Sequence, residues 1–114
     1  MEKTFKDKLA EAVTMIEKKG LAYAKARAIS WQLQELRKVV LAEETRKAEG
    51  TSISEREAIA RSSEIYRQHL EGTKEAIHDE LKLKAECERW RATWESIRSL
   101  LSLEKKTMEV FKEE

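Results

Sequence analysis

The most suggestive chemistry in this sequence is a tryptophan set among basic residues. Trp31 follows Arg27 by one helical turn and precedes Lys38 by two turns. A flat indole between cations suits a single-stranded nucleic acid, because the ring can stack on a base while Arg and Lys track the phosphates. We predict that single-stranded DNA contacts these side chains: Arg27, Trp31, Arg37, Lys38, Arg46 and Lys47. The alternative is that Trp31 fills an interface between subunits, where tryptophan is enriched.

Charge is unevenly distributed along the chain, although the whole sequence carries a net charge of only +1. Residues 17–47 hold eight basic and four acidic residues, a net charge of +4. Residues 49–89 hold seven basic and ten acidic residues, a net charge of −3. The pattern predicts a basic arm followed by an acidic arm, and the basic arm is the one suited to a polyanion.

The stretch RWRATWESIRSLLSLEKKTMEVF concentrates large apolar side chains near the C-terminus. Its apolar arc is too broad for one partner helix, which indicates a second contact surface. We predict that this surface is an oligomerisation face made of the following residues: Trp90, Trp94, Ile97, Leu100, Leu101 and Leu103. The alternative is that the first helix of the same chain covers it.

Catalytic and metal-binding signatures are absent from the sequence. There is no glycine-rich phosphate loop and no H-E-x-x-H motif. His69 and His78 are nine residues apart, on opposite sides of a helix, so they do not share a metal. Cys87 stands between two glutamates, which favours a packed apolar role over a thiolate. We expect no enzyme activity, no catalytic residue, no metal and no cofactor.

Helices must position these side chains, because 114 residues with no proline and three glycines leave little material for turns. Gly20 predicts the end of a first helix over 1–19, and an apolar stripe predicts a basic helix over 21–48. Ser52 with Glu55, and Ser54 with Glu57, form two overlapping capping boxes that begin a long helix over 54–105. We expect that helix to pass through Gly72.

The two long stripes fit one another in an antiparallel hairpin. A turn centred on Thr51 pairs residues whose numbers add up to about 102, which brings Leu33 near His69 and Ile29 near Thr73. The predicted fold is therefore all-α: a single helical domain over 1–114, built as a long antiparallel helical hairpin with N- and C-terminal helical extensions, and oligomeric. Whether the first helix continues the second or folds back at Gly20 is left open by the sequence.

Composition also bears on location. No apolar run approaches the ~20 residues of a membrane span, and a single cysteine suits a reducing compartment. We expect a soluble protein of the cytoplasm that does not bind a membrane.

Two segments carry a family resemblance. EREAIARSSEIYRQHLEGTKEAIHDELKLK, followed by WESIRSLLSLEKKTM, resembles the UvsY-type recombination mediators of tailed bacteriophages. The similarity lies in the layout: a helix ending in a basic, glycine-containing turn, a long charged helix, and a C-terminal helix rich in Trp and Leu. It covers roughly residues 33–108. This chain differs in its near-neutral charge and in Glu43 and Glu44 beside the basic cluster.

The resemblance implies a ring-forming helical protein that binds single-stranded DNA and helps a recombinase displace the single-strand-binding protein. By position, it assigns DNA contacts to Arg37, Lys38, Arg46 and Lys47, and ring contacts to Trp94, Ile97, Leu100 and Leu101. We therefore expect a phage recombination mediator, in the cytoplasm of the host cell, whose partners are single-stranded DNA, further copies of itself, and a recombinase or single-strand-binding protein. The alternative is a helical protein–protein adaptor or inhibitor without direct DNA binding, and a third reading is a coiled-coil scaffold.

Overall fold

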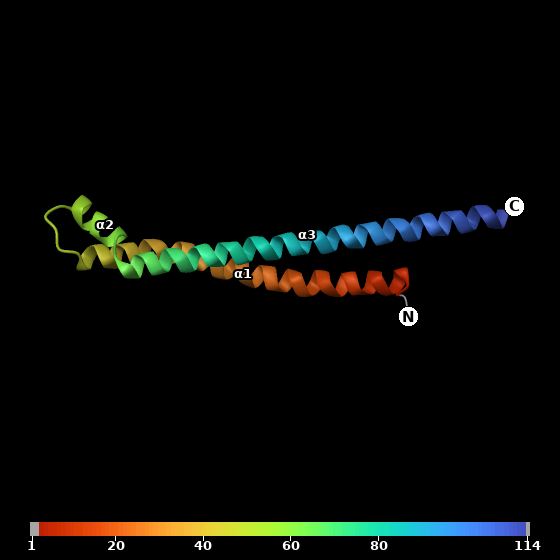
Figure 1. Cartoon of the computed structure of the whole chain (residues 1–114), viewed down its shortest axis with the longest axis horizontal. Helices are drawn as coiled ribbons and strands as arrows, with labels where there is room; N and C mark the ends of the chain where they lie inside the picture. Colours follow the sequence, from red (N-terminus) through yellow and green to blue (C-terminus); the bar gives the residue numbers. More distant parts are fainter. Residues whose placement is uncertain (1–2, 114) are drawn as a thin grey trace. The chain divides into compact units, whose positions relative to one another are not determined.

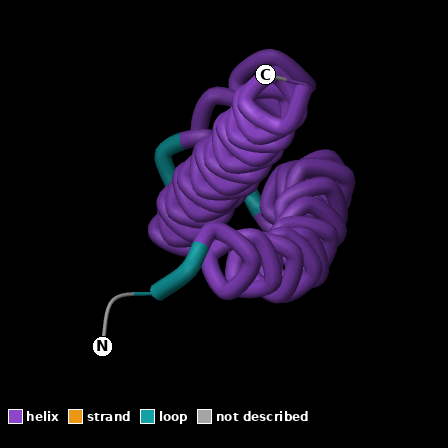
Figure 2. The backbone as a smooth tube through the Cα atoms, turned by 90° about the vertical axis from the view of Figure 1, so that its right-hand side faces the viewer, coloured by secondary structure: helices purple, strands orange, loops and turns teal. Residues whose placement is uncertain are grey.

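The computed structural model describes residues 3–113, and all of its regular structure is helical (Figure 1). Three α-helices follow one another: α1 (Phe5–Lys47), α2 (Ile53–Arg61) and α3 (Glu64–Glu113). Within the described residues there is no strand, as Figure 2 also shows. The all-α prediction is therefore confirmed.

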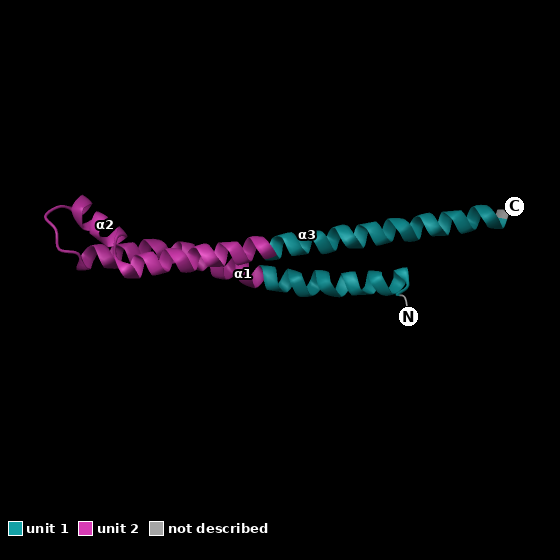
Figure 3. Ribbon diagram, viewed as in Figure 1, with its two compact units in different colours: residues 1–23, 83–114 teal, residues 24–82 magenta. Residues whose placement is uncertain are grey.

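The chain divides into two compact units, and α1 and α3 each contribute to both (Figure 3). Unit 1 comprises Met1–Tyr23 and Leu83–Glu114, and unit 2 comprises Ala24–Lys82. In each unit a segment of α1 packs against a segment of α3, and unit 2 also contains α2.

Unit 1 has an apolar seam. Its buried side chains are Ala12 from α1 and Cys87 and Ile97 from α3, each at most 8% exposed. Covered positions of α3 recur at intervals of three and four residues, which is the spacing of a left-handed coiled coil. They are Leu83, Cys87, Trp90, Trp94, Ile97 and Leu101. One ion pair crosses this seam, with Lys19 Nζ 2.9 Å from Glu86 Oε2.

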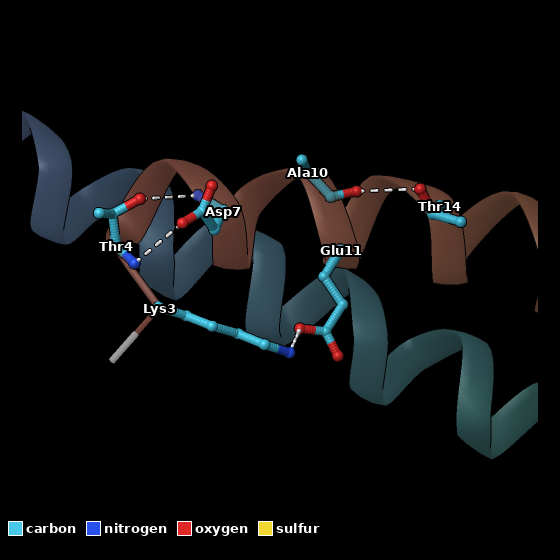
Figure 4. A network of polar contacts seen from close by, with 6 residues as sticks. All are labelled: Lys3, Thr4, Asp7, Ala10, Glu11 and Thr14. Carbon is cyan, nitrogen blue, oxygen red and sulfur yellow. Dashed lines mark hydrogen bonds and ion pairs between the residues drawn. The ribbon is translucent and has the colours of Figure 1, made fainter. Parts of the chain in front are cut away.

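A capping box begins α1 (Figure 4). Thr4 Oγ1 accepts a hydrogen bond from the Asp7 backbone N–H at 3.1 Å, and the Asp7 carboxylate accepts one from the Thr4 N–H at 3.3 Å. Lys3 Nζ lies 2.7 Å from Glu11 Oε2 on the same face. These contacts satisfy backbone donors that a helix start leaves without partners.

Unit 2 has a polar seam. Ser30 is fully buried, and Thr73 and Tyr66 are 7% and 8% exposed. His69 Nε2 donates to the Leu33 carbonyl oxygen at 2.8 Å, which joins α3 to α1. The predicted pairing of Leu33 with His69 is therefore confirmed. The apolar stripes predicted for the two helices are only partly buried, because Ile29, Leu36 and Leu70 are 45%, 41% and 38% exposed.

The helix end predicted at Gly20 is wrong, since α1 runs through it without a break. A glycine that ends a helix usually adopts a positive φ, and no glycine among the described residues does so. The chain therefore continues in the same helix from residue 19 to residue 21. Gly72 lies inside α3, as predicted.

The helix predicted over 54–105 is divided at Ser62 and Ser63. Ser62 caps the end of α2, and Ser63 Oγ accepts from the Tyr66 N–H at 3.2 Å to begin α3, which continues past residue 105 to Glu113. The cap predicted at Ser52 is present, because its hydroxyl accepts from the Glu55 N–H at 3.1 Å. Ser54 lies within α2 and caps nothing.

Candidate nucleic-acid interface

A groove runs between α1 and α3 in unit 2. Its volume is about 330 Å³, and it is lined by Gln34, Arg37, Leu70, Thr73, Lys74 and Ile77. Hydrogen bonds fix two of the lining side chains. Gln34 Nε2 donates to Ser30 Oγ at 3.0 Å, and Thr73 Oγ1 donates to the His69 carbonyl at 2.8 Å.

Cations from both helices line this groove. Arg37 belongs to α1 and Lys74 to α3. Neither forms an ion pair within residues 3–113, and no carboxylate lines the groove. Two unpaired cations that line one groove are suited to an anion.

Other predicted side chains share this side of α1. Arg27, Trp31 and Lys38 lie seven residues before, three before and four after Gln34, so helical periodicity places them on its face. All three are exposed, and Trp31 is 65% exposed. Four of the six residues predicted to contact DNA, counting Arg37, therefore lie together on what we call the basic side of unit 2.

Arg46 and Lys47 are not brought to the basic side. Arg46 lies eight residues after Lys38, which turns it about 80° further around the helix. Lys47 points elsewhere still, and its Nζ lies 3.5 Å from Glu44 Oε1. A cation already paired with a carboxylate adds little to phosphate binding.

Two cations of α3 join the basic side and were missed by the sequence reasoning. Lys74 lines the groove, and Arg67 lies seven residues before it on the same face of α3. Both occur in residues 49–89, which were not expected to bind DNA because their net charge is −3. The signal was available in their seven-residue spacing. Two exposed carboxylates share this surface: Glu35 lies four residues after Trp31 and three before Lys38, and Glu71 lies four residues after Arg67 and three before Lys74. They offset part of the positive charge of the basic side.

The predicted oligomerisation residues fall into two groups in unit 1. Ile97 is 8% exposed and Trp90, Trp94 and Leu101 are half-buried, because α1 covers the side of α3 that they share. Ile97 is therefore not free to contact a second copy. The guanidinium of Arg98 also lies 5.3 Å from the Trp94 ring centre.

Leu100 and Leu103 remain open, at 47% and 61% exposed. Further apolar residues extend this surface toward the end of α3: Met108 63%, Val110 59% and Phe111 71% exposed. A groove of about 840 Å³ lies among Lys6, Leu101, Met108 and neighbouring residues. Charged residues also line that groove, among them Glu104, Lys105 and Glu109. Several large apolar side chains exposed on one helix segment are typical of a contact surface.

The cysteine and the two histidines were the remaining candidates for chemistry. Cys87 is a free, buried cysteine in the seam of unit 1, as expected. His78 is exposed beside Asp79, whereas His69 bonds to Leu33. The described part of the chain has no group of three or more His, Cys, Asp or Glu placed to hold a metal ion. Within residues 3–113, no helix combines the length and apolar character needed to cross a bilayer.

Comparison with known proteins gives no relative. No protein-family model matches the sequence, and neither a curated protein nor a solved structure is detectably similar to it.

Proposed function

We propose that this protein binds single-stranded DNA along the basic side of unit 2 and assembles as a homo-oligomer, acting as a recombination accessory protein of the phage mediator type. The observation that carries the proposal is the grouping of Arg27 and Lys38 with exposed Trp31 on one face of α1, beside Arg37 at the groove; within residues 3–113 none of these three cations forms an ion pair. The recombination role, the host cytoplasm, and a recombinase or single-strand-binding protein as further partner rest on the family resemblance.

The binding physics favours a single strand over a duplex. An indole can stack on an unpaired base, a contact worth about 1–3 kcal/mol per base, while nearby cations hold the phosphates. Bases in a duplex are already stacked on one another. Trp31 therefore supports a ligand with unpaired bases, whereas the cations alone would suit any polyanion.

Oligomerisation would strengthen a weak site. One copy offers only a few uncompensated cations, and the phosphate contribution to affinity grows with their number. Copies joined through Leu100, Leu103 and the apolar residues that follow would present several basic sides to one strand. The gain is one of effective concentration and needs no new DNA contact.

Fluorescence anisotropy with a labelled oligo-dT at low and moderate salt tests the proposal. Arg27→Ala and Trp31→Ala should each weaken binding about tenfold, with the salt dependence reduced for Arg27→Ala alone. Lys25→Ala is the matched control, because Lys25 is exposed two residues away on another face. No binding by the unaltered protein, even in large excess, would end the DNA proposal.

A second candidate is a helical adaptor or inhibitor that binds a protein. It is favoured by exposed residues on the outer face of α1 in unit 2, which recur at intervals of four and three. They are Ala24, Ala28, Trp31, Glu35, Lys38 and Ala42. Such spacing is typical of a further helix–helix contact. Changing Arg27 and Arg37 together to alanine separates the candidates, because neither belongs to that outer face: an adaptor should keep its partner and a DNA binder should lose its ligand.

A further inference from the structure

We infer that the groove between Arg37 and Lys74 is a phosphate site built from both helices of unit 2, so that α3 contributes to nucleic-acid binding together with α1. This inference rests on the proposed function, because it supplies a defined position for one backbone phosphate of the strand. It also adds Lys74 and Arg67, neither of which belongs to the basic arm of the sequence.

The groove offers donors from two directions. Arg37 presents a planar fork of N–H groups from α1, and Lys74 presents an ammonium from α3. Gln34 uses one of its two amide N–H groups on Ser30 Oγ, which fixes the side chain and leaves the other available. A phosphate between the walls can therefore accept charge-assisted bonds from both helices.

The surroundings strengthen that attraction. Leu70 and Ile77 line the same groove between the two cations, so no other charged side chain lies within its lining. The groove lining contains no carboxylate that would repel the phosphate. Thr73 contributes no donor, because its hydroxyl proton is already given to the His69 carbonyl.

The path of the strand follows from the helical repeat. Arg67 lies seven residues from Lys74, or about 10 Å along α3 at 1.5 Å per residue. Lys38 lies one residue after Arg37 and about 100° further around α1, on the face that also carries Trp31. A strand that leaves the central phosphate can therefore pass Arg67 on α3, or Trp31 and Lys38 on α1.

A double-mutant cycle tests the inference, using anisotropy with labelled oligo-dT and the full chain. Arg37→Ala and Lys74→Ala should each weaken binding about tenfold and lower the salt slope by about one. Because both cations hold one phosphate, the double variant should lose clearly less than the hundredfold product of the single losses. Lys82→Ala is the matched control, since Lys82 is exposed on α3 about 80° around the helix from Lys74.

Competition with pyrophosphate separates the sources of phosphate. Pyrophosphate should displace the oligonucleotide from the unaltered protein, and millimolar pyrophosphate should raise its melting temperature but not that of the double variant. Oligonucleotide binding unchanged by Lys74→Ala, with Arg37→Ala defective, would overturn the two-helix site while leaving the proposed function in place.

The opposite result is equally distinguishable. If the oligonucleotide fails to bind but pyrophosphate still stabilises the unaltered protein through Arg37 and Lys74, the phosphate site stands and the proposed function fails. Additive losses in the double variant would show that the two cations hold separate phosphates, and would overturn the shared site. Far-ultraviolet circular dichroism of each variant confirms that the helices are retained.

Discussion

The two units use the same pair of helices but differ in what their seams are made of. Unit 1 packs Trp90, Trp94 and Ile97 of α3 against α1, so its seam is held by apolar burial. Unit 2 buries Ser30 and Thr73 beside Tyr66 and joins its helices through the hydrogen bond from His69 to the Leu33 carbonyl. Small polar side chains bury little apolar area, so the second seam depends more on hydrogen-bond geometry.

This difference explains where each unit has surface to offer. In unit 2 a groove lies beside the buried Thr73, and Arg37 and Lys74 line that groove. In unit 1 Ile97 and the two tryptophans of α3 are covered by α1, and the exposed surface includes apolar side chains such as Leu100 and Leu103. A groove lined by cations and an apolar helix face attract different partners, which is why we assign nucleic acid to one and further copies of the chain to the other.

The largest effect on stability is expected at Ile97, in the apolar seam of unit 1. Ile97→Ala removes a side chain that is 8% exposed and leaves a cavity in the apolar seam, so the free energy of unfolding should fall by about 2 kcal/mol. Urea denaturation followed by circular dichroism measures the loss.

Leu103→Ala is the control in the same helix, because Leu103 is 61% exposed. It should leave the free energy of unfolding of the monomer within about 0.5 kcal/mol while lowering the mass seen by light scattering. Equal stability losses at the two positions would contradict the division of the C-terminal residues into a covered and an open group.

The hydrogen bond of unit 2 should give a smaller effect. His69→Ala removes the bond to the Leu33 carbonyl, which should cost about 1 kcal/mol of unfolding free energy. His69→Gln retains an N–H donor and should recover part of the loss. The exposed His78 supplies the control, since His78→Ala breaks no contact between helices. A loss as large as that of Ile97→Ala would mean that the two seams do not differ in kind.

The hairpin could be predicted from the sequence because it depends on spacing alone. Two stripes that match when folded about Thr51 place Leu33 opposite His69, and the structure has a hydrogen bond there. The boundary at Ser62 and Ser63 could not be predicted from apolar spacing, because it depends on the hydroxyl of Ser63 accepting from the Tyr66 N–H in place of a helical partner. The helix end predicted at Gly20 was wrong for a related reason. A glycine ends a helix when it adopts a positive φ, and the sequence does not specify φ.

The candidate site was half predictable. Arg27, Trp31, Arg37 and Lys38 lie on the basic side, although their contact with DNA stays a prediction. Lys74 was missed because charge was counted along the chain, whereas the helix distributes charge by face. Arg46 and Lys47 were chosen for closeness to the turn, and their helical angles carry them away from the groove.

Replacing glycine with alanine should stabilise both units by a similar small amount. Gly20 in unit 1 and Gly72 in unit 2 are helical, and an added Cβ at either meets nothing within 4 Å. Each change should raise the free energy of unfolding by about 0.5–1 kcal/mol. Gly50→Ala is the contrasting control, because its Cβ would lie 3.1 Å from Arg56 Cγ. A gain at Gly50 equal to those at Gly20 and Gly72 would contradict this packing.

The smallest expected effect is a difference in pH dependence between the turn of unit 2, at Glu55, and the start of α1 in unit 1, at Lys3. Hydrogen bonds from the Thr51 hydroxyl and backbone N–H hold the pKa of Glu55 below its ordinary value of 4.5. A carboxylate with a lowered pKa stabilises the fold above its unfolded pKa, and that contribution is lost as pH falls through the folded value. In unit 1 the hydrogen bond and charge of the Glu11 carboxylate raise the pKa of Lys3 above its ordinary value of 10.5, so the contribution of the charged lysine is lost as pH rises through that raised value.

Amide hydrogen exchange in α2, compared near pH 6 and pH 3 and corrected for intrinsic rates, measures the Glu55 effect. Protection at the start of α2 should fall on acidification in the unaltered protein and change less in Glu55→Gln, which carries no ionisable group there. Lys3→Met alters a contact at the start of α1 and keeps the hydrogen bonds between Thr51 and Glu55, so it should leave the acid response of α2 unaltered. An equal acid response in Glu55→Gln would show that another carboxylate controls the turn.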